Sequence, residues 1–178
     1  MSRRDATRRT SVPDAIALLQ KDHARVRKLL AQLVESRTGS ARTQREQLLK
    51  AIEQELKVHT RIEEEIFYPA FRDAAGKKKD EKRLYFEAVE EHHVVDLALP
   101  ELKKSRTDSE EFAAKAKVLK DLIEHHVKEE EREMFPRAKK LMDREELLKL
   151  GERFARAKTS LVKERRGLRR KLPKLVRS

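Results

Sequence analysis

Four segments of this sequence place apolar residues three or four positions apart, which is the spacing of one face of an α-helix. Short stretches of turn-forming residues separate these segments, among them Thr38-Gly39-Ser40 and the run from Ser105 to Ser109. Alternation with a period of two, which marks half-buried strands, is hard to find. The pattern therefore predicts an all-α protein whose long helices, joined by short loops, pack as an antiparallel four-helix bundle.

Each of the four apolar faces also contains one histidine at a position that should be buried. These histidines are His23, His59, His92 and His126. In two of the faces a glutamate follows the histidine by four residues, which gives the pairs His59/Glu63 and His126/Glu130. Residues four apart lie above one another on the same side of a helix, so both carboxylates should also be buried.

Burying these groups without partners would cost roughly 1–3 kcal/mol for each neutral polar group and more for each charge. A bound metal is the most economical partner, because imidazole and carboxylate suit iron, manganese or zinc, and bundle cores can hold such sites. Four histidines and two glutamates are too many ligands for one tetrahedral zinc, and they fit two ions. The alternative is that the histidines are ordinary core residues, or surface residues on wrongly assigned faces.

The two halves of the chain repeat this pattern at an interval of 67 to 69 residues. Each histidine–glutamate pair is followed by a proline ten residues after its histidine, Pro69 in one half and Pro136 in the other. The repeat brings both pairs toward one centre, as a two-ion site requires. Two of the four histidines have a second histidine beside them in the sequence, His93 and His125. These lie roughly 100° off the apolar faces and are expected at the surface or beside the site.

Other residues near the two pairs receive simpler interpretations. Three glutamates are interpreted as solvated charges, and three aromatic residues as caps of the core at the helix ends. The glutamates are Glu64, Glu129 and Glu131, and the aromatic residues are Phe67, Tyr68 and Phe135.

The charge of the chain is concentrated at its ends. Lys and Arg number 44 against 32 Asp and Glu, a net charge of +12, yet residues 13–152 together carry only −1. The excess lies in residues 1–12 and 153–178. We therefore expect three parts: a flexible basic N-terminal segment (1–12), the helix bundle (13–142), and a basic C-terminal helix or tail (143–178).

The basic tail supports an alternative function. Its cations alternate with leucines at helical spacing and could contact nucleic acid or an anionic membrane surface, with the bundle as a structural scaffold. Such contact would be weak and sensitive to salt, and the tail lacks the interleaved aromatic residues that stack on bases. The candidate residues are Arg165, Arg166, Arg169, Arg170, Lys171 and Lys174.

Composition excludes several classes of protein. The chain has no cysteine, which rules out disulfide frameworks, thiolate metal sites and a cysteine nucleophile. It has no apolar run near the 18 or so residues of a membrane helix, and no apolar segment follows its basic start as in a secretory signal. We therefore expect a cytoplasmic protein without a transmembrane segment.

In these motifs the sequence resembles the hemerythrin-like proteins of the HHE cation-binding family. The resemblance is carried by LLQKDHARVRKLL, VHTRIEEEIFYPAF, EEHHVVDLALPEL and LIEHHVKEEEREMFPRA, and it covers about residues 13–140. It implies an up-down-up-down bundle around a non-heme centre of two iron ions, with manganese or zinc as the other ions that suit the ligand types. It further implies binding or sensing of O₂, iron or related small oxidants such as peroxide or nitric oxide, and a role in stress response. The implied ligands are His23, His59, Glu63, His92, His126 and Glu130.

One position departs from the oxygen-carrying hemerythrins that the sequence resembles. Those proteins have a second histidine one turn after the histidine of the third helix, where this chain has Asp96. Asp96 could ligate instead, with His93 or His125 as further candidates for an additional ligand or a supporting residue, or the metal could lose a protein ligand. The sequence specifies no organic substrate pocket. We therefore expect a binding or sensing protein, and redox activity toward peroxide or nitric oxide stays open.

Overall fold

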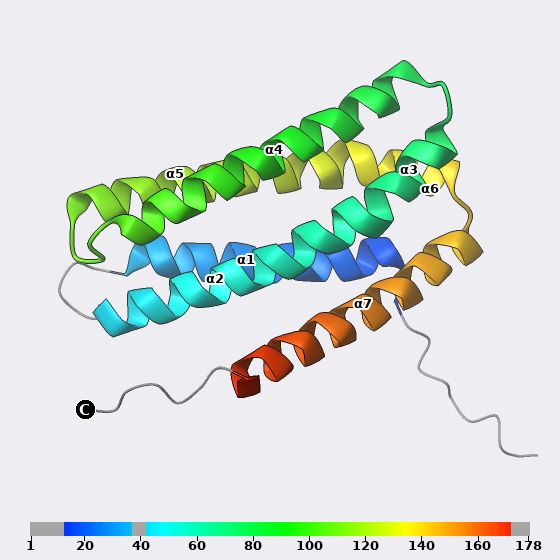
Figure 1. Ribbon diagram of the computed structural model, residues 1–178. Coiled ribbons are helices and arrows are strands. Elements are labelled where there is room, and N and C mark those ends of the chain that lie inside the picture. Colours follow the sequence, from blue (N-terminus) through cyan, green and yellow to red (C-terminus); the bar gives the residue numbers. More distant parts are fainter. Residues whose placement is uncertain (1–12, 37–41, 172–178) are drawn as a thin grey trace, which may run out of the picture.

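The computed structural model describes residues 13–36 and 42–171, and these ranges are helical apart from short connections (Figure 1). The prediction of an all-α fold is confirmed for the described ranges. The elements are α1 (Ala15–Glu35), α2 (Arg42–Ile62), η1 (Glu63–Phe67), α3 (Tyr68–Ala75), α4 (Lys79–Lys104), α5 (Glu110–Glu129), η2 (Glu130–Met134), α6 (Phe135–Leu141) and α7 (Arg144–Lys171). Of these, η1 and η2 are single turns of π-helix.

The four long helices α1, α2, α4 and α5 lie side by side and run alternately in opposite directions (Figure 1). Helix α1 contacts α2 and α5, and α4 contacts α5. Helix α2 continues through η1 into α3, and α5 continues through η2 into α6, so each of these two continuous helices contains one π-helical turn. We call them the interrupted rods, and together with α1 and α4 they are the four rods of the bundle. The two interrupted rods are the ones that contain the histidine–glutamate pairs.

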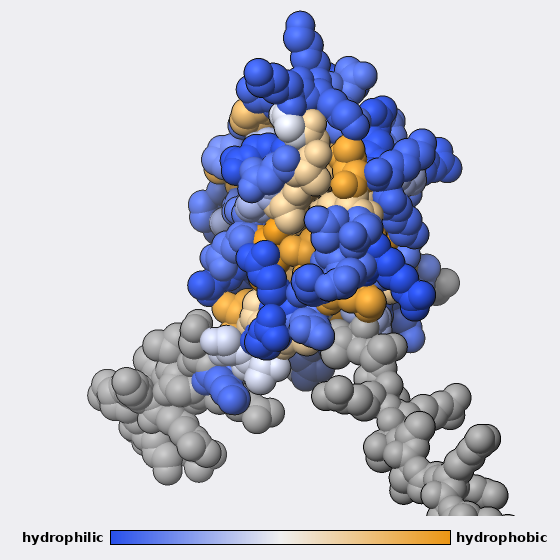
Figure 2. Space-filling model, turned by 90° about the vertical axis from the view of Figure 1, so that its right-hand side faces the viewer, coloured by the Kyte–Doolittle hydropathy of each residue, from blue (hydrophilic) through white to orange (hydrophobic). Residues whose placement is uncertain are grey.

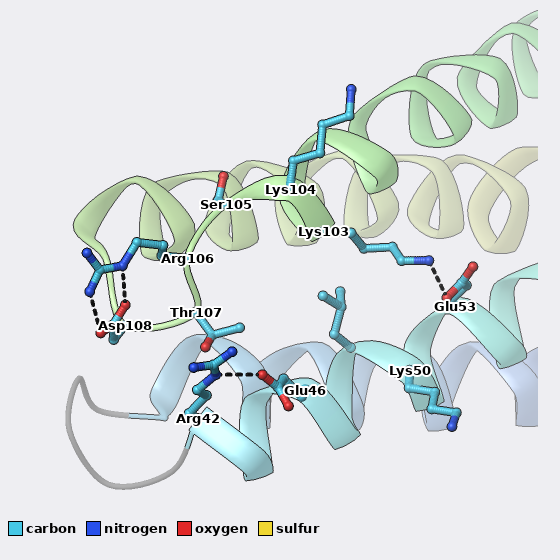
Figure 3. A pocket seen from close by; sticks show the side chains of 11 residues that line it. Arg42, Glu46, Lys50, Glu53, Lys103, Lys104, Ser105, Arg106, Thr107 and Asp108 are labelled. Carbon is cyan, nitrogen blue, oxygen red and sulfur yellow. Dashed lines mark hydrogen bonds and ion pairs between the residues drawn. The ribbon is translucent and has the colours of Figure 1, made fainter. Parts of the chain in front are cut away.

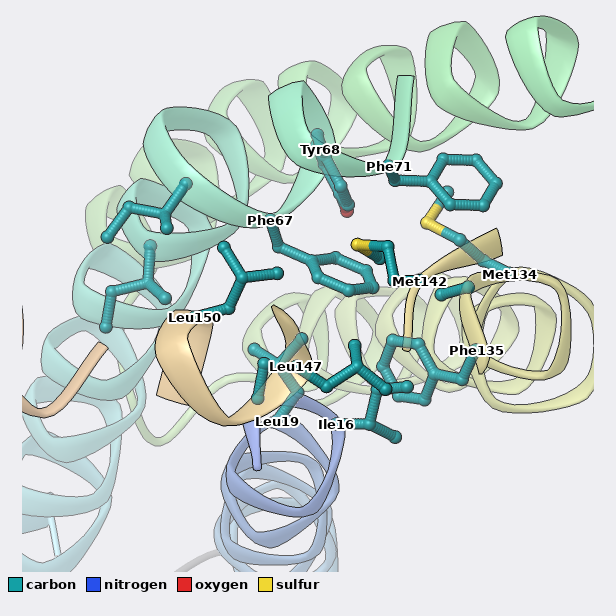
Figure 4. Close-up of a cluster of buried hydrophobic side chains, with 14 of the residues drawn as sticks. Ile16, Leu19, Phe67, Tyr68, Phe71, Met134, Phe135, Met142, Leu147 and Leu150 are labelled. Atoms are coloured by element: carbon teal, nitrogen blue, oxygen red, sulfur yellow. The ribbon is translucent and has the colours of Figure 1, made fainter. Parts of the chain in front are cut away.

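The apolar interior is divided into two core clusters. The first core cluster lies where α3, α6 and α7 meet the start of α1, and it contains most of the buried aromatic residues (Figure 4). The second core cluster lies toward the other end and is built from aliphatic residues and Phe112. On α1 the first cluster ends at Leu19 and the second begins at Val26, with the buried His23 between them. A layer of buried polar residues therefore separates two apolar regions.

Helix ends are defined by side-chain caps. The carboxylate of Asp14 accepts a hydrogen bond from the backbone N–H of Ala17 at 2.8 Å, and the hydroxyl of Ser109 accepts one from Phe112 at 3.1 Å. Caps of this kind satisfy backbone donors that the first helical turn leaves free. They fix where α1 and α5 begin, and so they fix the register of the histidines farther along.

Helix α7 packs across α1 and α2 rather than extending away from them (Figure 1). Leu147, Leu150 and Phe154 are buried and belong to the first core cluster. Gly151 lies so close to the start of α1 that an added Cβ would stand 2.3 Å from the carbonyl oxygen of Pro13. At this end of the molecule the surface is mostly hydrophilic, and apolar side chains show in the gaps between charged ones (Figure 2). None of the helices in the described ranges is long and apolar enough to cross a membrane.

Candidate metal centre

The layer between the two core clusters is a cluster of four histidines and two glutamates, hereafter the His/Glu cluster. Its members come from all four rods: one histidine from α1, one from α4, and a histidine with its glutamate from each interrupted rod. All six residues are at most 5% exposed. The residues are His23, His59, Glu63, His92, His126 and Glu130.

Glu63 lies at the centre of the cluster. One of its carboxylate oxygens stands 3.1 Å from Nε2 of His59 and 3.3 Å from Nε2 of His92, and the other stands 3.8 Å from Nε2 of His23. Glu63 therefore contacts imidazoles from three different helices, and a carboxylate in this position can bridge two ions.

Glu130 takes the equivalent place in the second half of the repeat. Its Oε2 atom stands 3.2 Å from Nε2 of His23 and 3.6 Å from Nε2 of His126. The Nε2 atoms of His92 and His126 are 3.1 Å apart. Potential ligand atoms form two groups that share Glu63: one with His23, His59 and Glu130, the other with His92 and His126.

The π-helical turns coincide with the spacing of six residues from glutamate to proline, which occurs in both halves of the chain. In each rod the turn begins at the cluster glutamate, and the backbone N–H five residues later donates to its carbonyl, from Tyr68 to Glu63 and from Phe135 to Glu130. The next residue is a proline, which has no N–H to donate and so favours a departure from regular α-helical bonding. Single π-helical turns are frequent at functional sites because they re-aim side chains.

The outer nitrogens of the imidazoles are held by carboxylates from neighbouring helices. Nδ1 of His23 lies 3.0 Å from Glu131, Nδ1 of His92 lies 2.9 Å from Glu64, and Nδ1 of His126 lies 2.8 Å from Glu91. His59 is different, because its Nδ1 is 3.9 Å from the carboxylate of Asp22. Such partners orient metal-binding imidazoles and leave the inner nitrogen free for the ion.

These contacts correct the interpretation of the glutamates as solvated charges. Glu64 and Glu131, each the residue after a cluster glutamate, support imidazoles, whereas Glu129 contacts His125 instead. Asp22 and Glu91 were missed entirely. Each directly precedes a cluster histidine, and the two positions match in the internal repeat, which is the signal that could have identified them.

Tyr68 does more than cap the core. Its hydroxyl donates a hydrogen bond of 2.9 Å to Oε1 of Glu130, and it lies 3.4 Å from Nε2 of His92. The equivalent residue of the other half is Phe135, whose ring stacks on His23 as that of Tyr68 stacks on His92. The two halves of the site therefore differ by one hydroxyl group.

The protein's own charges balance within the cluster. Burial lowers the pKa of His23, but contacts with Glu130 and Glu63 outweigh burial and raise it to about 10. Burial likewise lowers the pKa of His92, and Glu63 with Glu64 raises it to about 9. Burial raises the pKa of Glu63, yet the surrounding imidazoles hold it well below its usual value. Protons on imidazoles thus neutralise the buried carboxylates, and a cation could replace them.

The chemistry of the donor set fits a metal. Several buried atoms of the cluster residues have no hydrogen-bond partner among the described residues. They are Nε2 of His23, both ring nitrogens of His59, both oxygens of Glu63, and Oε2 of Glu130. Unpaired buried polar groups are costly, and imidazole nitrogen with carboxylate oxygen is a donor set that iron, manganese and zinc accept.

A small cavity adjoins the four imidazoles. Its volume is about 20 Å³, and apart from the histidines and Thr60 it is lined by aliphatic side chains of the second core cluster. A volume of roughly 10–15 Å³ on this measure holds one water-sized molecule. The cavity therefore offers room for a ligand of that size beside the inner nitrogens.

The three additional candidates lie outside the cluster. His93 and Asp96 are exposed on the outer side of α4, so neither reaches the buried ligands. Val95 and Asp96 are three and four residues after His92, about one helical turn. Of the two, Val95 faces the interior and Asp96 is exposed. His125 is also exposed, and it contacts Glu91 and Glu129 at the surface.

Two further places are a surface cavity and the basic tail. A larger cavity of about 600 Å³ lies far from the cluster, between α2 and the connection from α4 to α5 (Figure 3). Its charged residues largely pair with one another, as Arg42 with Glu46 and Arg106 with Asp108 do. In the tail, α7 extends to Lys171, but the side chains of Arg165, Arg166, Arg169, Arg170 and Lys171 lie outside the described part, as do Lys174 and residues 1–12.

Comparisons with known proteins agree with this geometry. The family model described as the hemerythrin HHE cation binding domain matches residues 14–138. A crystal structure of a hemerythrin HHE cation binding domain-containing protein from Mycobacterium kansasii is similar, with 28% sequence identity and a TM-score of 0.74. The similarity covers 89% of this chain and 94% of that one. A search of curated proteins gave no match.

Proposed function

This chain belongs to the hemerythrin HHE cation-binding domain family, and on that premise we propose that it is a non-heme di-iron protein. Its ligands are the six residues of the His/Glu cluster, held in an up-down-up-down four-helix bundle. The observation that carries the proposal is the set of buried ligand atoms without hydrogen-bond partners among the described residues, which come from α1 and from the two rods that contain the histidine–glutamate pairs. A purely structural bundle gains nothing from burying such groups.

The number of ions follows from the grouping of the ligands. Two sets of donor atoms share Glu63, and within each set the atoms lie within 4.8 Å of one another. One tetrahedral ion would leave two of the six side chains unused. Iron is the ion that the family resemblance favours, and manganese or zinc would satisfy the same ligands.

We further propose that the centre binds O₂ or a related small oxidant. The cavity of about 20 Å³ beside the imidazoles supports a ligand of this size and is too small for an organic substrate. Bound iron would supply an open coordination position for such a ligand. The chain's own residues exclude bulk water with aliphatic side chains and orient the imidazoles through outer carboxylates.

Metal analysis with an optical spectrum tests the proposal. Protein produced with iron should contain about two iron ions per chain and show near-ultraviolet charge-transfer absorption that changes on addition of O₂ or peroxide. The double variant His59→Ala/His126→Ala should lose most of the metal, and His93→Ala, which alters an exposed histidine, should retain it. Equal metal contents in all three proteins would contradict the proposal.

A further inference from the structure

A second group of potential metal ligands lies at the surface of α4 and α5. Nε2 of His125 stands 3.4 Å from Oε1 of Glu91 and 3.4 Å from Oε1 of Glu129. His125 is 63% exposed, and both carboxylates are about one-quarter to one-third exposed. This group, hereafter the surface triad, shares none of the six residues of the His/Glu cluster.

The spacing of the surface triad is that of a metal site. His125 and Glu129 are four residues apart on one helix, as the two buried pairs are, and Glu91 approaches from the neighbouring helix. Around an ion bound at about 2.1 Å, tetrahedral ligand atoms stand about 3.4 Å apart. An ion could therefore occupy the space between the three side chains with little rearrangement.

The charge of the surface triad also favours a cation. Among the described residues, Glu129 forms an ion pair only with His125, and Glu91 only with His125 and His126. Neither carboxylate has a lysine or arginine within ion-pair distance in that part of the chain. Carboxylate oxygens and an imidazole nitrogen are ligand types that divalent transition-metal ions accept, and no cationic side chain of the described residues occupies their place.

In the first half of the internal repeat, other residue types occupy the three positions equivalent to the surface triad. The position of Glu91 is taken there by Asp22, and Lys158 of α7 forms an ion pair with this carboxylate. Val58 and Ile62 stand where the second half has His125 and Glu129, and both are packed into the first core cluster. Helix α7 covers this half by contacting α1 and α2. In the first half, therefore, a lysine pairs with the carboxylate and apolar residues fill the other two positions. In the second half all three positions have side chains that can bind a metal.

We propose that Glu91, His125 and Glu129 form a surface site for a single divalent transition-metal ion, separate from the His/Glu cluster. Water molecules complete the coordination of the ion. Glu91 links the two sites, because its Oε2 atom accepts a hydrogen bond from Nδ1 of the buried His126 while its Oε1 atom faces His125. The ligand types suit Zn²⁺, Mn²⁺ or Fe²⁺.

The first experiment locates the ion directly. Crystals of the full chain are soaked in Zn²⁺ at a few equivalents per chain, and anomalous differences are collected at the zinc edge. The proposal predicts a peak between the three side chains in the wild-type protein and its absence in His125→Ala. A peak at the His/Glu cluster alone, or no peak, overturns this inference, and the first of these outcomes leaves the di-iron proposal intact. A peak at the surface triad alone supports this inference and counts against the di-iron proposal.

The second experiment measures affinity in solution. Full-length protein treated with a chelator is titrated calorimetrically with Zn²⁺. His125→Ala and Glu129→Gln should weaken one class of sites at least about tenfold, because each removes a ligand. His93→Ala is the matched control, since it removes an exposed histidine of α4 outside the triad, and it should leave the titration unchanged. Equal titrations for all four proteins would overturn the inference.

Discussion

Each buried imidazole of the His/Glu cluster lies between an inner carboxylate and an outer one from another helix. The outer carboxylates occupy matched positions: Asp22 and Glu91 precede a cluster histidine, and Glu64 and Glu131 follow a cluster glutamate. The internal repeat thus extends beyond the six residues of the His/Glu cluster to the carboxylates that contact the imidazoles. Only His59 has a distant outer partner, Asp22, and this carboxylate also forms an ion pair with Lys158.

The hydroxyl of Tyr68 should contribute to stability through its hydrogen bond to Glu130. Tyr68→Phe leaves Oε1 of a buried carboxylate without this donor, so we expect a loss of about 1–3 kcal/mol in the free energy of unfolding of the metal-free protein. Urea denaturation measures the loss. Tyr85→Phe is the control, because no hydrogen bond of its hydroxyl occurs within the described residues, and an equal effect of both variants would contradict the assignment.

The raised pKa values of His23 and His92 determine how the metal-free protein responds to pH. Their folded-state values of about 10 and about 9 exceed the unfolded value of about 6.5. Their contribution to stability is therefore fully present below pH 6.5 and is lost as pH rises through 9 and 10. Urea denaturation of chelated protein at pH 6.5 and pH 9.5 should show this decline. His23→Gln should reduce it, and an unchanged slope in that variant would contradict the assignment.

At the residue scale the sequence predicted which side chains would be buried together but not how they would be supported. The six residues of the His/Glu cluster could be named because each interrupts an apolar helical face, and all six are buried. The partners Asp22, Glu91, Glu64 and Glu131 lie off those faces, where a charged residue is usually solvated. Their contacts depend on which helices become neighbours, and helical periodicity does not contain that information.

At the scale of elements, the apolar periodicity identified the helices, while the two π-helical turns and the packing of α7 were not predicted. The π-helical turns arise where a proline follows the cluster glutamate by six residues, and this local signal was seen only as part of a repeat. Helix α7 was expected as a basic helix or tail beyond the bundle. Its first turns instead complete the first core cluster, because Leu147, Leu150 and Phe154 are buried there.

Gly151 is the residue that allows α7 to approach α1 closely. A glycine inside a helix is ordinarily less favourable than alanine by about 0.5–1 kcal/mol, so Gly→Ala alone would stabilise. Here the added Cβ would meet the backbone of Pro13 and Asp14, which cannot move aside as a flexible side chain could. We expect Gly151→Ala to lower the free energy of unfolding by about 1–3 kcal/mol. Chemical denaturation shows whether the free energy of unfolding falls or rises, and a stabilised variant would show that α7 does not pack as described.

At the scale of the whole molecule, the His/Glu cluster joins four rods at one level between two apolar clusters. A metal bound there would cross-link all of them, and its binding free energy would add to the stability of the folded state because the unfolded chain has no preformed site. The salt-dependent contact expected of residues 143–178 with nucleic acid or anionic membranes stays a prediction.

Metal removal should therefore destabilise the whole fold and not only the site. At a free-ion concentration one hundred times the dissociation constant, binding adds about 2.7 kcal/mol to the free energy of unfolding. Thermal unfolding of iron-loaded protein should occur at a higher temperature than after treatment with a chelator, and adding iron back should restore it. The double variant His59→Ala/His126→Ala should show no difference between the two conditions. If the wild-type protein also showed none, the bundle would be stable on apolar packing alone, and the buried ligands would contribute nothing through a metal.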